Sequence, residues 1–400
     1  METRRKRNND SVFKQTLDTT PVKKLKKMSD KIDQMKEVII ENETKCLDLA
    51  FAMDCTGSMQ SYINEARNNI CKIVEEIVAS ENIDVRLALV EYRDHPPEDT
   101  SFVTRCHDFT KSSKTMKGWL STCSATGGGD TPEAVADALH DLLKLSWRED
   151  STKICVCISD APPHGLGCTS DGFPEGCPNG IDPVVVSNQL AAEGITLYVA
   201  GCEPAIIPYK DFFMAIAHIT GGQYVPMRKA QVLSKVIVCG AQEELSLNDL
   251  MAEVDAEVRA RMQAGEEIND HAVSGFLHNK WTERGQQAVQ LQMDNAELNS
   301  VQDSPEAKKY SQMKTLAEIK KVFKEKPGRY ASFGSHACGR GASLFCKPVS
   351  GSTGFGAGGD YSTGTCFGAA CSSTFGSVAT GVTFAQSSRL VQKAIAKNKK

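Results

Sequence analysis

The segment Asp54-Cys55-Thr56-Gly57-Ser58 places three oxygen-bearing side chains within five residues, directly after the apolar run 47–53. Alternate residues of an extended loop point the same way, so Asp54, Thr56 and Ser58 can face one ligand. Carboxylate and hydroxyl oxygens suit Mg²⁺, Mn²⁺ or Ca²⁺ better than zinc. The same residues could instead be a strand followed by a helix cap, since Thr and Ser commonly bond the first amides of a helix. Both interpretations are open on these residues alone.

Two further loops offer oxygen ligands at comparable positions. A second apolar run, residues 153–159, also ends at an acid, Asp160. The glycine-rich segment 127–133 contains Asp130 and Thr131 just before an apolar stripe at helical spacing. Because the carboxyl ends of parallel strands face one crevice, ligands from distant loops can converge there. The predicted metal ligands are Asp54, Thr56, Ser58 and Asp160, completed by Asp130 or Thr131.

Residues 46–244 are expected to position these side chains as one α/β domain. Strand and helix patterns alternate along it, which is typical of a doubly wound, mostly parallel, Rossmann-like sheet with helices on both faces. Strands are expected at 47–53, 85–92, 102–109, 153–159, 195–200 and 223–226. Helices are expected at 59–78, 114–123, 182–193, 209–219 and from 231 onward, with another that Thr131 would cap and Pro132 would begin. A turn-rich loop joins the second and third strands, which predicts an antiparallel edge.

The combination of these motifs resembles a von Willebrand factor type A (VWFA) domain. The segments that carry the resemblance are Asp54–Met59, Tyr92–Pro97, Gly127–Glu133 and Ser159–Gly165. They look like the type A domain that accompanies atypical alpha-kinases of the VwkA-like group. The resemblance covers about residues 46–240, roughly half of the chain.

The resemblance implies a metal-ion-dependent adhesion site (MIDAS). In such a site, the hydroxyls of Thr56 and Ser58 would bind the cation, while Asp54 and Asp160 would bind it directly or through water. The family's second-loop threonine falls near Asp130 by one alignment and at Thr131 by another. The resemblance also implies a protein-interaction module rather than an enzyme. A protein partner would offer a carboxylate to an open position on Mg²⁺ or Mn²⁺, with Ca²⁺ also compatible.

Enzymatic and zinc-binding alternatives have weaker support. No kinase-like strand and lysine pattern follows residue 240, so phosphorylation by this chain is not expected. A regulatory or scaffold relative of the alpha-kinases is the alternative function. Gly354–Gly359 matches a nucleotide-binding glycine pattern, but no buried strand precedes it. A zinc site formed by His164, Cys168 and Cys177 would lack the paired Cys-x-x-Cys spacing.

Composition indicates an intracellular chain. The fifteen cysteines are an odd number without a signal-peptide pattern, which favours reduced thiols. No stretch reaches the roughly 18 apolar residues of a membrane span. The net charge of -4 combines an acidic middle with two basic ends, so we expect no nucleic-acid binding. A cytoplasmic location is expected, and the basic clusters near the N-terminus are also compatible with a nuclear one.

Three segments flank the predicted domain. Residues 1–45 are expected to be a basic arm with a lead-in helix, and residues 245–328 a charged helical extension. Residues 329–400 are rich in Gly and Ser and repeat a Phe-Gly pair, which predicts a disordered low-complexity tail. The Phe-Gly pairs and the basic arm together suggest a further hypothesis, a partner in the nucleus.

Overall fold

The computed structural model describes residues 44–80, 83–325 and 373–398. The predicted basic arm, the lead-in helix and the part of the predicted tail before residue 373 lie outside the described residues. Apart from Thr44 and Lys45, the described residues belong to one compact unit, 46–400.

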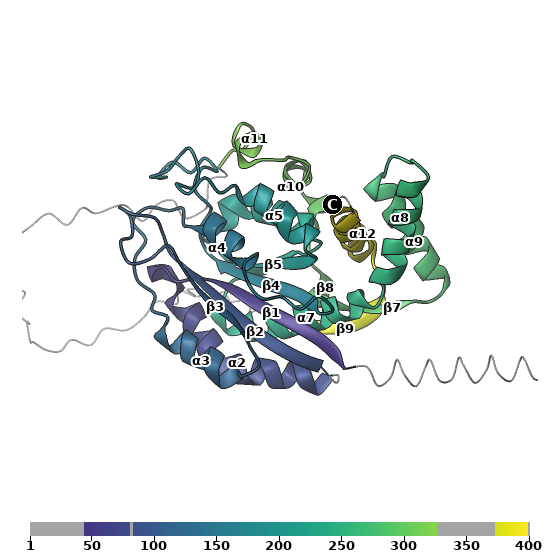
Figure 1. Cartoon of the computed structure of the whole chain (residues 1–400), viewed down its shortest axis with the longest axis horizontal. Coiled ribbons are helices and arrows are strands. Elements are labelled where there is room, and N and C mark those ends of the chain that lie inside the picture. The colour runs from purple at the N-terminus through teal and green to yellow at the C-terminus, as the bar shows by residue number, and fades with distance from the viewer. Residues whose placement is uncertain (1–43, 81–82, 326–372, 399–400) are drawn as a thin grey trace, which may run out of the picture. The chain divides into compact units, whose positions relative to one another are not determined.

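A six-stranded sheet lies at the centre of this unit, with the strand order β3-β2-β1-β4-β5-β6 (Figure 1). Its strands are β1 (Lys45–Asp54), β2 (Ile83–Tyr92), β3 (Thr104–Thr110), β4 (Thr152–Ser159), β5 (Ile195–Cys202) and β6 (Tyr224–Met227). Strand β4 runs parallel to β1 and β5, and β6 runs parallel to β5, whereas β3 is antiparallel to β2. The predicted doubly wound, mostly parallel sheet with an antiparallel edge is therefore confirmed.

Helices cover both faces of the sheet. They are α2 (Gln60–Ser80), α3 (Ser113–Thr122), α4 (Val135–Leu142), α5 (Pro183–Ala192), α6 (Lys210–Ile219) and α7 (Leu233–Asn248). Residues of α2, α3 and α7 share one hydrophobic core with the sheet, and residues of α4, α5 and α6 share the other. In Figure 1, α2 and α3 lie below the sheet, and α4 and α5 lie above it.

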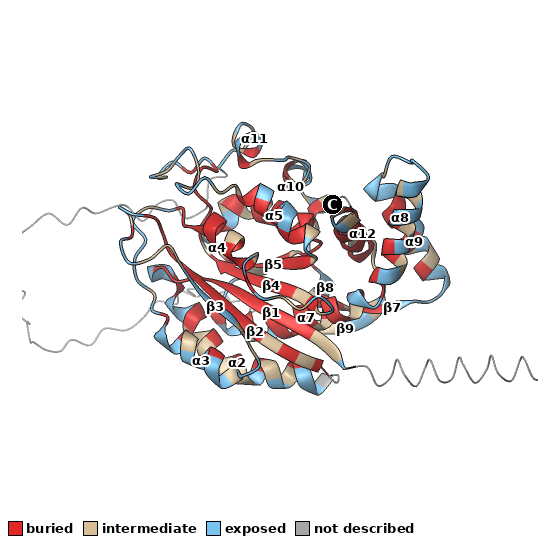
Figure 2. Cartoon of the chain, in the orientation of Figure 1, coloured by how far each residue is buried: buried red, intermediate tan, exposed pale blue. Residues whose placement is uncertain are grey.

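Strand β1 shows how the sequence produces these two cores. Leu47, Leu49, Phe51 and Met53 face the core with α2, whereas the smaller Ala50 and Ala52 face the core with α4. Side chains alternate across a strand, so a strand in the middle of a sheet must be apolar on both faces. Strands β1, β2, β4 and β5 are accordingly mostly buried in Figure 2, whereas the edge strand β3 has no buried residue. Strand β1 thus holds its last residue in a fixed position at the carboxyl end of the sheet.

The chain after α7 builds a further layer. It contains α8 (Met251–Gln263), α9 (Asp270–Glu283), β7 (Gln287–Met293), β8 (Ala296–Glu297), α10 (Pro305–Tyr310), α11 (Leu316–Lys320), β9 (Phe375–Gly381) and α12 (Phe384–Asn398). Short 3-10 helices lie at Gly57–Met59, Ile207–Tyr209, Ala230–Val232 and Val301–Asp303. Strands β8, β7 and β9 form a second, antiparallel sheet. Helix α12 packs on α8 and α9 around a third hydrophobic core.

The elements after α7 differ from two expectations drawn from the sequence. Residues 245–328 are not purely helical, because β7 and β8 lie within them. Residues 375–398 form a strand and a helix rather than part of a disordered tail. Strand β9 is held by antiparallel pairing along the length of β7, and Val391 and Ala394 of α12 are completely buried. Ordering therefore comes from partners distant in sequence, which a local composition rule does not take into account.

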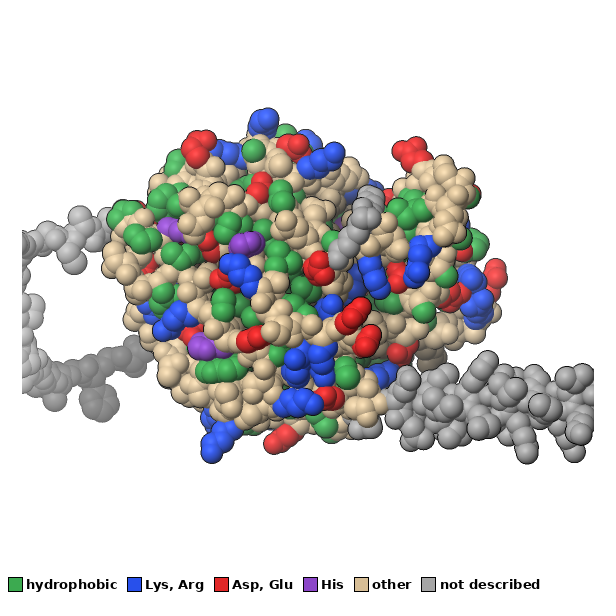
Figure 3. All heavy atoms as spheres, viewed as in Figure 1, with side chains coloured by type: hydrophobic (Ala, Val, Ile, Leu, Met, Phe, Trp, Pro, Cys, Tyr) green, Lys and Arg blue, Asp and Glu red, His purple; other side chains and the backbone are tan. Residues whose placement is uncertain are grey.

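The described surface gives two further observations. Among the described residues, no helix combines the length and apolar character needed to cross a membrane. On the face drawn in Figure 3, basic and acidic side chains are interspersed over the described residues. That face therefore carries mixed charge rather than a continuous basic stripe.

Candidate metal centre

The first predicted loop begins where strand β1 ends. Asp54 is its last residue and is completely buried, and Thr56 is only 3% exposed. Oδ1 of Asp54 accepts hydrogen bonds from the amide of Thr56 at 2.9 Å and from its hydroxyl at 2.6 Å. Thr56 precedes the 3-10 helix Gly57–Met59 but makes no capping bond with its side chain. Its hydroxyl therefore faces Asp54, and the helix-cap interpretation does not apply.

Asp160 follows the neighbouring strand β4. Because β1 and β4 are paired in parallel as far as the end of β1, their carboxyl ends lie side by side. Ser159 Oγ lies 3.3 Å from Oδ2 of Asp54, and the hydroxyl of Ser58 bonds to Asp160. Ser58 is exposed and Asp160 is partly exposed. The structure thus brings together Asp54, Thr56, Ser58 and Asp160 at an edge that reaches solvent.

The glycine-rich loop approaches this group through its backbone. The amide of Gly57 donates to the carbonyl of Gly127 at 3.4 Å. Gly127 and Gly128 have φ angles of 86° and 84°, which residues with a side chain rarely adopt. A Cβ atom on Gly128 would lie 2.9 Å from Oε1 of Glu133 and 3.5 Å from Cβ of Thr56. Glycine at this position therefore allows Glu133 to lie next to Thr56.

The two candidates for the second-loop position have different surroundings. Oδ2 of Asp130 accepts a hydrogen bond from the amide of Gly172 at 2.5 Å, while its buried Oδ1 has no hydrogen-bond partner. Burial raises the pKa of Asp130 to about 6, and the charge of Asp94 adds to this rise. Thr131 is exposed, and its hydroxyl is 2.6 Å from that of Ser170. Asp130 thus lies among the buried acids, whereas Thr131 lies at the surface.

Glu133 belongs to the same group, although the sequence prediction missed it. Its side chain is buried, and Oε2 has no hydrogen-bond partner. Burial is the main reason that its pKa rises to about 10. The other contributions come from the charges of Asp54, Asp94, Asp130 and Asp160. Glu133 therefore lies within electrostatic reach of all four acids.

The sequence prediction missed Glu133 because it placed the start of the following helix too early. Thr131 and Pro132 were expected to open a helix, but α4 begins at Val135 and Thr131 does not cap it. The amide of Glu133 donates to the carbonyl of Pro162 at 2.9 Å, and Glu133 forms a parallel β-bridge with Pro163. This bridge fixes Glu133 beside the loop that carries Asp160. The signal in the sequence was a second acid, four residues after the run of glycines that ends at Gly129.

A buried histidine supplies positive charge beside these acids. Asp94, two residues beyond β2, is completely buried, and its Oδ2 has no hydrogen-bond partner. Its Oδ1 lies 2.6 Å from Nε2 of His164, whose Nδ1 lies 2.8 Å from Oδ1 of Asp171. Burial alone would lower the pKa of His164, but hydrogen bonds to Asp171 and Asp94 raise it to about 9. His164 is therefore protonated at neutral pH, with both ring nitrogens donating.

Five acids form what we call the acid cluster: Asp54, Asp94, Asp130, Glu133 and Asp160. Burial raises the pKa of Asp54 to about 7, and the charge of Asp160 adds to this rise. Burial likewise raises the pKa of Asp160. Such shifts mean that the charged carboxylates are poorly compensated by the surrounding protein. A cation with a preference for oxygen ligands, such as Mg²⁺ or Mn²⁺, would relieve this repulsion.

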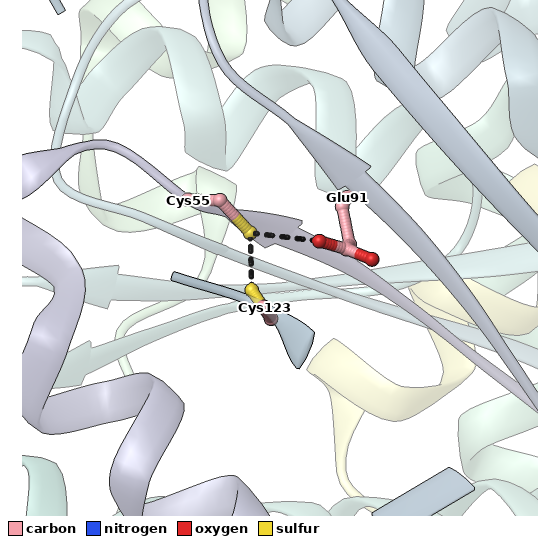
Figure 4. A group of neighbouring side chains, drawn as sticks. All are labelled: Cys55, Glu91 and Cys123. Carbon is pink, nitrogen blue, oxygen red and sulfur yellow. Dashed lines mark hydrogen bonds between the residues drawn. The ribbon is translucent and has the colours of Figure 1, made fainter. Parts of the chain in front are cut away.

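Two groups of thiols lie near the acid cluster. Among the described residues, His164, Cys168 and Cys177 do not form a group with ligand atoms within 4.8 Å of one another. Cys168 instead lies 3.3 Å from the hydroxyl of Tyr209, and Cys177 lies next to Asp137. The side chain of Cys55 points towards Cys123 and Glu91 (Figure 4). Its Sγ lies 2.7 Å from that of Cys123 and 4.0 Å from Oε2 of Glu91.

A family model for the von Willebrand factor A domain matches residues 48–168. This range contains most of β1, all of β2 to β4 and every predicted ligand from Asp54 to Asp160. The chain contains a von Willebrand factor A domain. A domain of this type suggests a protein-interaction module. Groups of His, Cys and acidic side chains that could hold a metal ion come from the matched residues, with Cys177 just beyond them.

Two curated relatives are similar to part of this chain. Alpha-protein kinase vwkA of Dictyostelium discoideum is 33% identical over 171 residues, which are 42% of this chain and 26% of the relative. A protein of Acanthamoeba polyphaga mimivirus, described as ariadne-like with a RING finger, is 26% identical over 204 residues, or 48% of this chain and 19% of the relative. The chain thus spans about a quarter or less of the length of either relative.

Solved structures with a similar fold are more distant. The pilus adhesin SpaC of Lactobacillus rhamnosus GG in its open conformation is 11% identical, covering 51% of this chain and 30% of that one with a TM-score of 0.38. Proximal thread matrix protein 1 of the mussel byssus is 15% identical, covering 50% of this chain and 47% of that one with a TM-score of 0.35. At these scores, neither structure bears on the function of the von Willebrand factor A domain described here.

Proposed function

We propose that this von Willebrand factor A domain binds an acidic group of a protein partner through a divalent cation. Asp54, Thr56, Ser58 and Asp160 are the proposed ligands, and Asp94, Asp130 and Glu133 are the other members of the acid cluster. The cation is Mg²⁺ or Mn²⁺, and Ca²⁺ also suits an all-oxygen set. Thr131 has no part in this proposal, because its exposed hydroxyl is bonded to Ser170.

One observation carries the proposal: buried acid oxygens converge without enough hydrogen-bond donors. Oε2 of Glu133, Oδ1 of Asp130 and Oδ2 of Asp94 are all buried and without a partner. An unpaired buried polar group is costly, so an arrangement of this kind is typical of a site that takes a ligand. Ser58 lies on the exposed side, where a partner's carboxylate could reach the cation. The geometry thus suits a cation shared between this chain and its partner.

The test of the function is metal-dependent capture of a partner. The full chain, immobilised without a metal-binding tag, is incubated with a lysate in Mg²⁺, in EDTA, and in EDTA followed by excess Mg²⁺. We expect a partner that is retained in Mg²⁺, released by EDTA and recovered on adding Mg²⁺ back, and that an Asp54→Ala chain does not retain. Retention that is equal in Mg²⁺ and EDTA would contradict a metal-dependent interface.

The similarity to an alpha-protein kinase favours a second candidate, a regulatory or scaffold role towards a separate kinase chain. The matched region of the Dictyostelium relative is only about a quarter of that protein. The same capture experiment addresses this candidate, because kinase activity would appear in the material that the chain retains. Activity in the purified chain itself would instead show that this chain is an enzyme.

The raised pKa values predict how pH changes the effect of the cation. The folded-state pKa of Asp54 is about 7, above the unfolded value of roughly 3.9. Its contribution to stability is therefore complete below about pH 4 and is lost as pH rises through about 7. Metal-free protein should lose stability over this range, while the stabilisation by Mg²⁺ should grow, because protons and Mg²⁺ compete for the same oxygens.

The measurement is the thermal unfolding midpoint with and without saturating Mg²⁺, at about pH 5.5 and about pH 8. Asp54→Asn is the control, because its amide keeps the shape of the side chain but does not titrate. We expect the gain from Mg²⁺ to be clearly larger at the higher pH in the wild-type chain and small at both pH values in the variant. An equal gain at both pH values in the wild-type chain would contradict the assignment.

A further inference from the structure

Within the described part of the chain, three groups of His, Cys and acidic side chains have ligand atoms within 4.8 Å of one another. Asp94, Asp130 and His164 are unsuitable for a metal that needs a histidine ligand, because both nitrogens of His164 already face carboxylates. Cys55 and Cys123 are too close together. Two zinc-bound thiolates would be about 3.8 Å apart, from a zinc–sulfur distance of about 2.3 Å in a tetrahedron, whereas these sulfurs are 2.7 Å apart.

The third group is His95, Asp137 and Cys177, which come from three separate segments. His95 lies in the loop after β2, Asp137 in the first turn of α4, and Cys177 in the long loop between β4 and α5. His95 and Asp137 are buried, and Cys177 is partly exposed. Oδ2 of Asp137 lies 2.9 Å from Nε2 of His95 and 3.1 Å from Sγ of Cys177. The remaining separation, from Sγ of Cys177 to Nε2 of His95, is 3.8 Å.

These separations are close to those of a tetrahedral zinc site. With zinc distances of about 2.3 Å to sulfur and about 2.1 Å to nitrogen or oxygen, the ligand atoms would be about 3.4 to 3.6 Å apart. Each observed separation differs from this by about half an ångström or less. Zinc also accepts this ligand set, which has one sulfur, one imidazole nitrogen and one carboxylate oxygen. Because Cys177 is partly exposed, an ion can reach the site from solvent.

Burial and the neighbouring carboxylate of Asp137 raise the pKa of the Cys177 thiol to about 12, so its thiolate needs a cation beside it, and two backbone amides would help to hold that thiolate. The amide of Asn179 donates to Sγ of Cys177 at 3.3 Å, and the amide of Ile181 also bonds to this sulfur. Hydrogen bonds to the charged form of a group stabilise that form. The side-chain amide of Asn179 donates at 2.7 Å to Oδ1 of Asp137, the oxygen that does not face Cys177. A second partner of this kind is what orients the ligands of metal sites.

We propose that His95, Asp137 and Cys177 bind a zinc ion, with water in the fourth position. Zinc here joins the long loop to α4 and to the segment after β2. The same loop carries Asp171 and Gly172, which contact His164 and Asp130 beside the acid cluster. Zinc therefore fixes the shape of one wall of that cluster. This site is separate from the proposed Mg²⁺ site and does not depend on it.

The direct test is the zinc content of the full chain, produced without a histidine tag in zinc-supplemented medium and measured by elemental mass spectrometry. We expect about one zinc per wild-type chain. Cys177→Ser should reduce this at least about fivefold, whereas Cys168→Ser, on the same loop, should leave it unchanged. Asp54→Ala should also retain zinc, which separates this result from failure of the Mg²⁺ site. A wild-type chain without zinc, or a Cys177→Ser chain with as much zinc as wild type, would overturn the proposal.

A second measurement needs no variant, in case Cys177→Ser does not fold. Metal-free wild-type chain is titrated with Co²⁺, which absorbs strongly in the visible range when it is tetrahedral and has a thiolate-to-metal band in the ultraviolet. We expect both features to develop with one equivalent of Co²⁺, to disappear on adding Zn²⁺, and to persist in a large excess of Mg²⁺. Absence of the thiolate band would contradict a site that includes Cys177.

Discussion

Replacing Asp54 with alanine is expected to abolish the stabilisation that Mg²⁺ or Mn²⁺ gives to the wild-type chain. A cation present at about a hundred times its Kd stabilises the folded state by roughly 2.7 kcal/mol if it binds only that state. Asp54 lies at the centre of the proposed site, because it is completely buried and bonded to Thr56 and Ser159. Its removal therefore takes away a ligand and the group that orients the hydroxyl of Thr56.

In the absence of a cation, Asp54→Ala should not lower the stability of the protein. Burial raises the pKa of Asp54 to about 7, so the charged carboxylate at pH 8 is unfavourable in the folded protein. Without a cation, Asp54→Ala should therefore be at least as stable as wild type at pH 8, and with saturating cation it should be less stable. If Asp54→Ala were less stable than wild type at pH 8 both with and without the cation, loss of a metal ligand would not explain the result.

Thermal unfolding during titration with each cation measures both effects. Asp150→Ala is the matched control, because it removes an exposed aspartate just before β4 and away from the acid cluster. The control should keep the full cation response. A wild-type chain that is not stabilised by either cation, or an Asp54→Ala chain that keeps the response, would contradict the metal site.

The second large effect is expected at Arg389 in α12, a residue that the sequence placed in the predicted low-complexity tail. Arg389 is 5% exposed, and its guanidinium pairs with Glu243 at 3.0 Å and contacts Glu244. It also donates to the hydroxyl of Tyr198 and to the carbonyl of Gly221, both at 2.8 Å. Arg389→Ala would leave two buried carboxylates without this partner. We expect a loss of about 3 to 5 kcal/mol in the free energy of unfolding.

Urea unfolding of the full chain measures this loss. Lys397→Ala is the control on the same helix, because Lys397 is largely exposed and its ion pair with Asp255 spans 3.4 Å. The control should change the free energy of unfolding by no more than about 1 kcal/mol. If Arg389→Ala were as stable as Lys397→Ala, α12 would not be an integral part of the fold.

The sequence determined the central sheet and most of the candidate site because their signals are local. Apolar runs that stop at Asp54 and Asp160 mark strand ends, and parallel pairing brings such ends together. Asp182 and Pro183 were predicted to open a helix, and the carboxylate of Asp182 indeed accepts bonds from the amides of Val184 and Val185. Each of these features depends on a few neighbouring residues and on the alternation of a strand.

Other features were decided by partners far away in the chain. Glu133 lies among the acids because Pro163 pairs with it, and without that bridge the sequence favours a helix start at Thr131. Strand β9 exists because β7 supplies its hydrogen bonds across about eighty residues of sequence. Arg389 is buried because Glu243 and Glu244 compensate its charge. Composition and periodicity describe the neighbours of a residue along the chain. The positions of Glu133, β9 and Arg389 depend instead on neighbours in space.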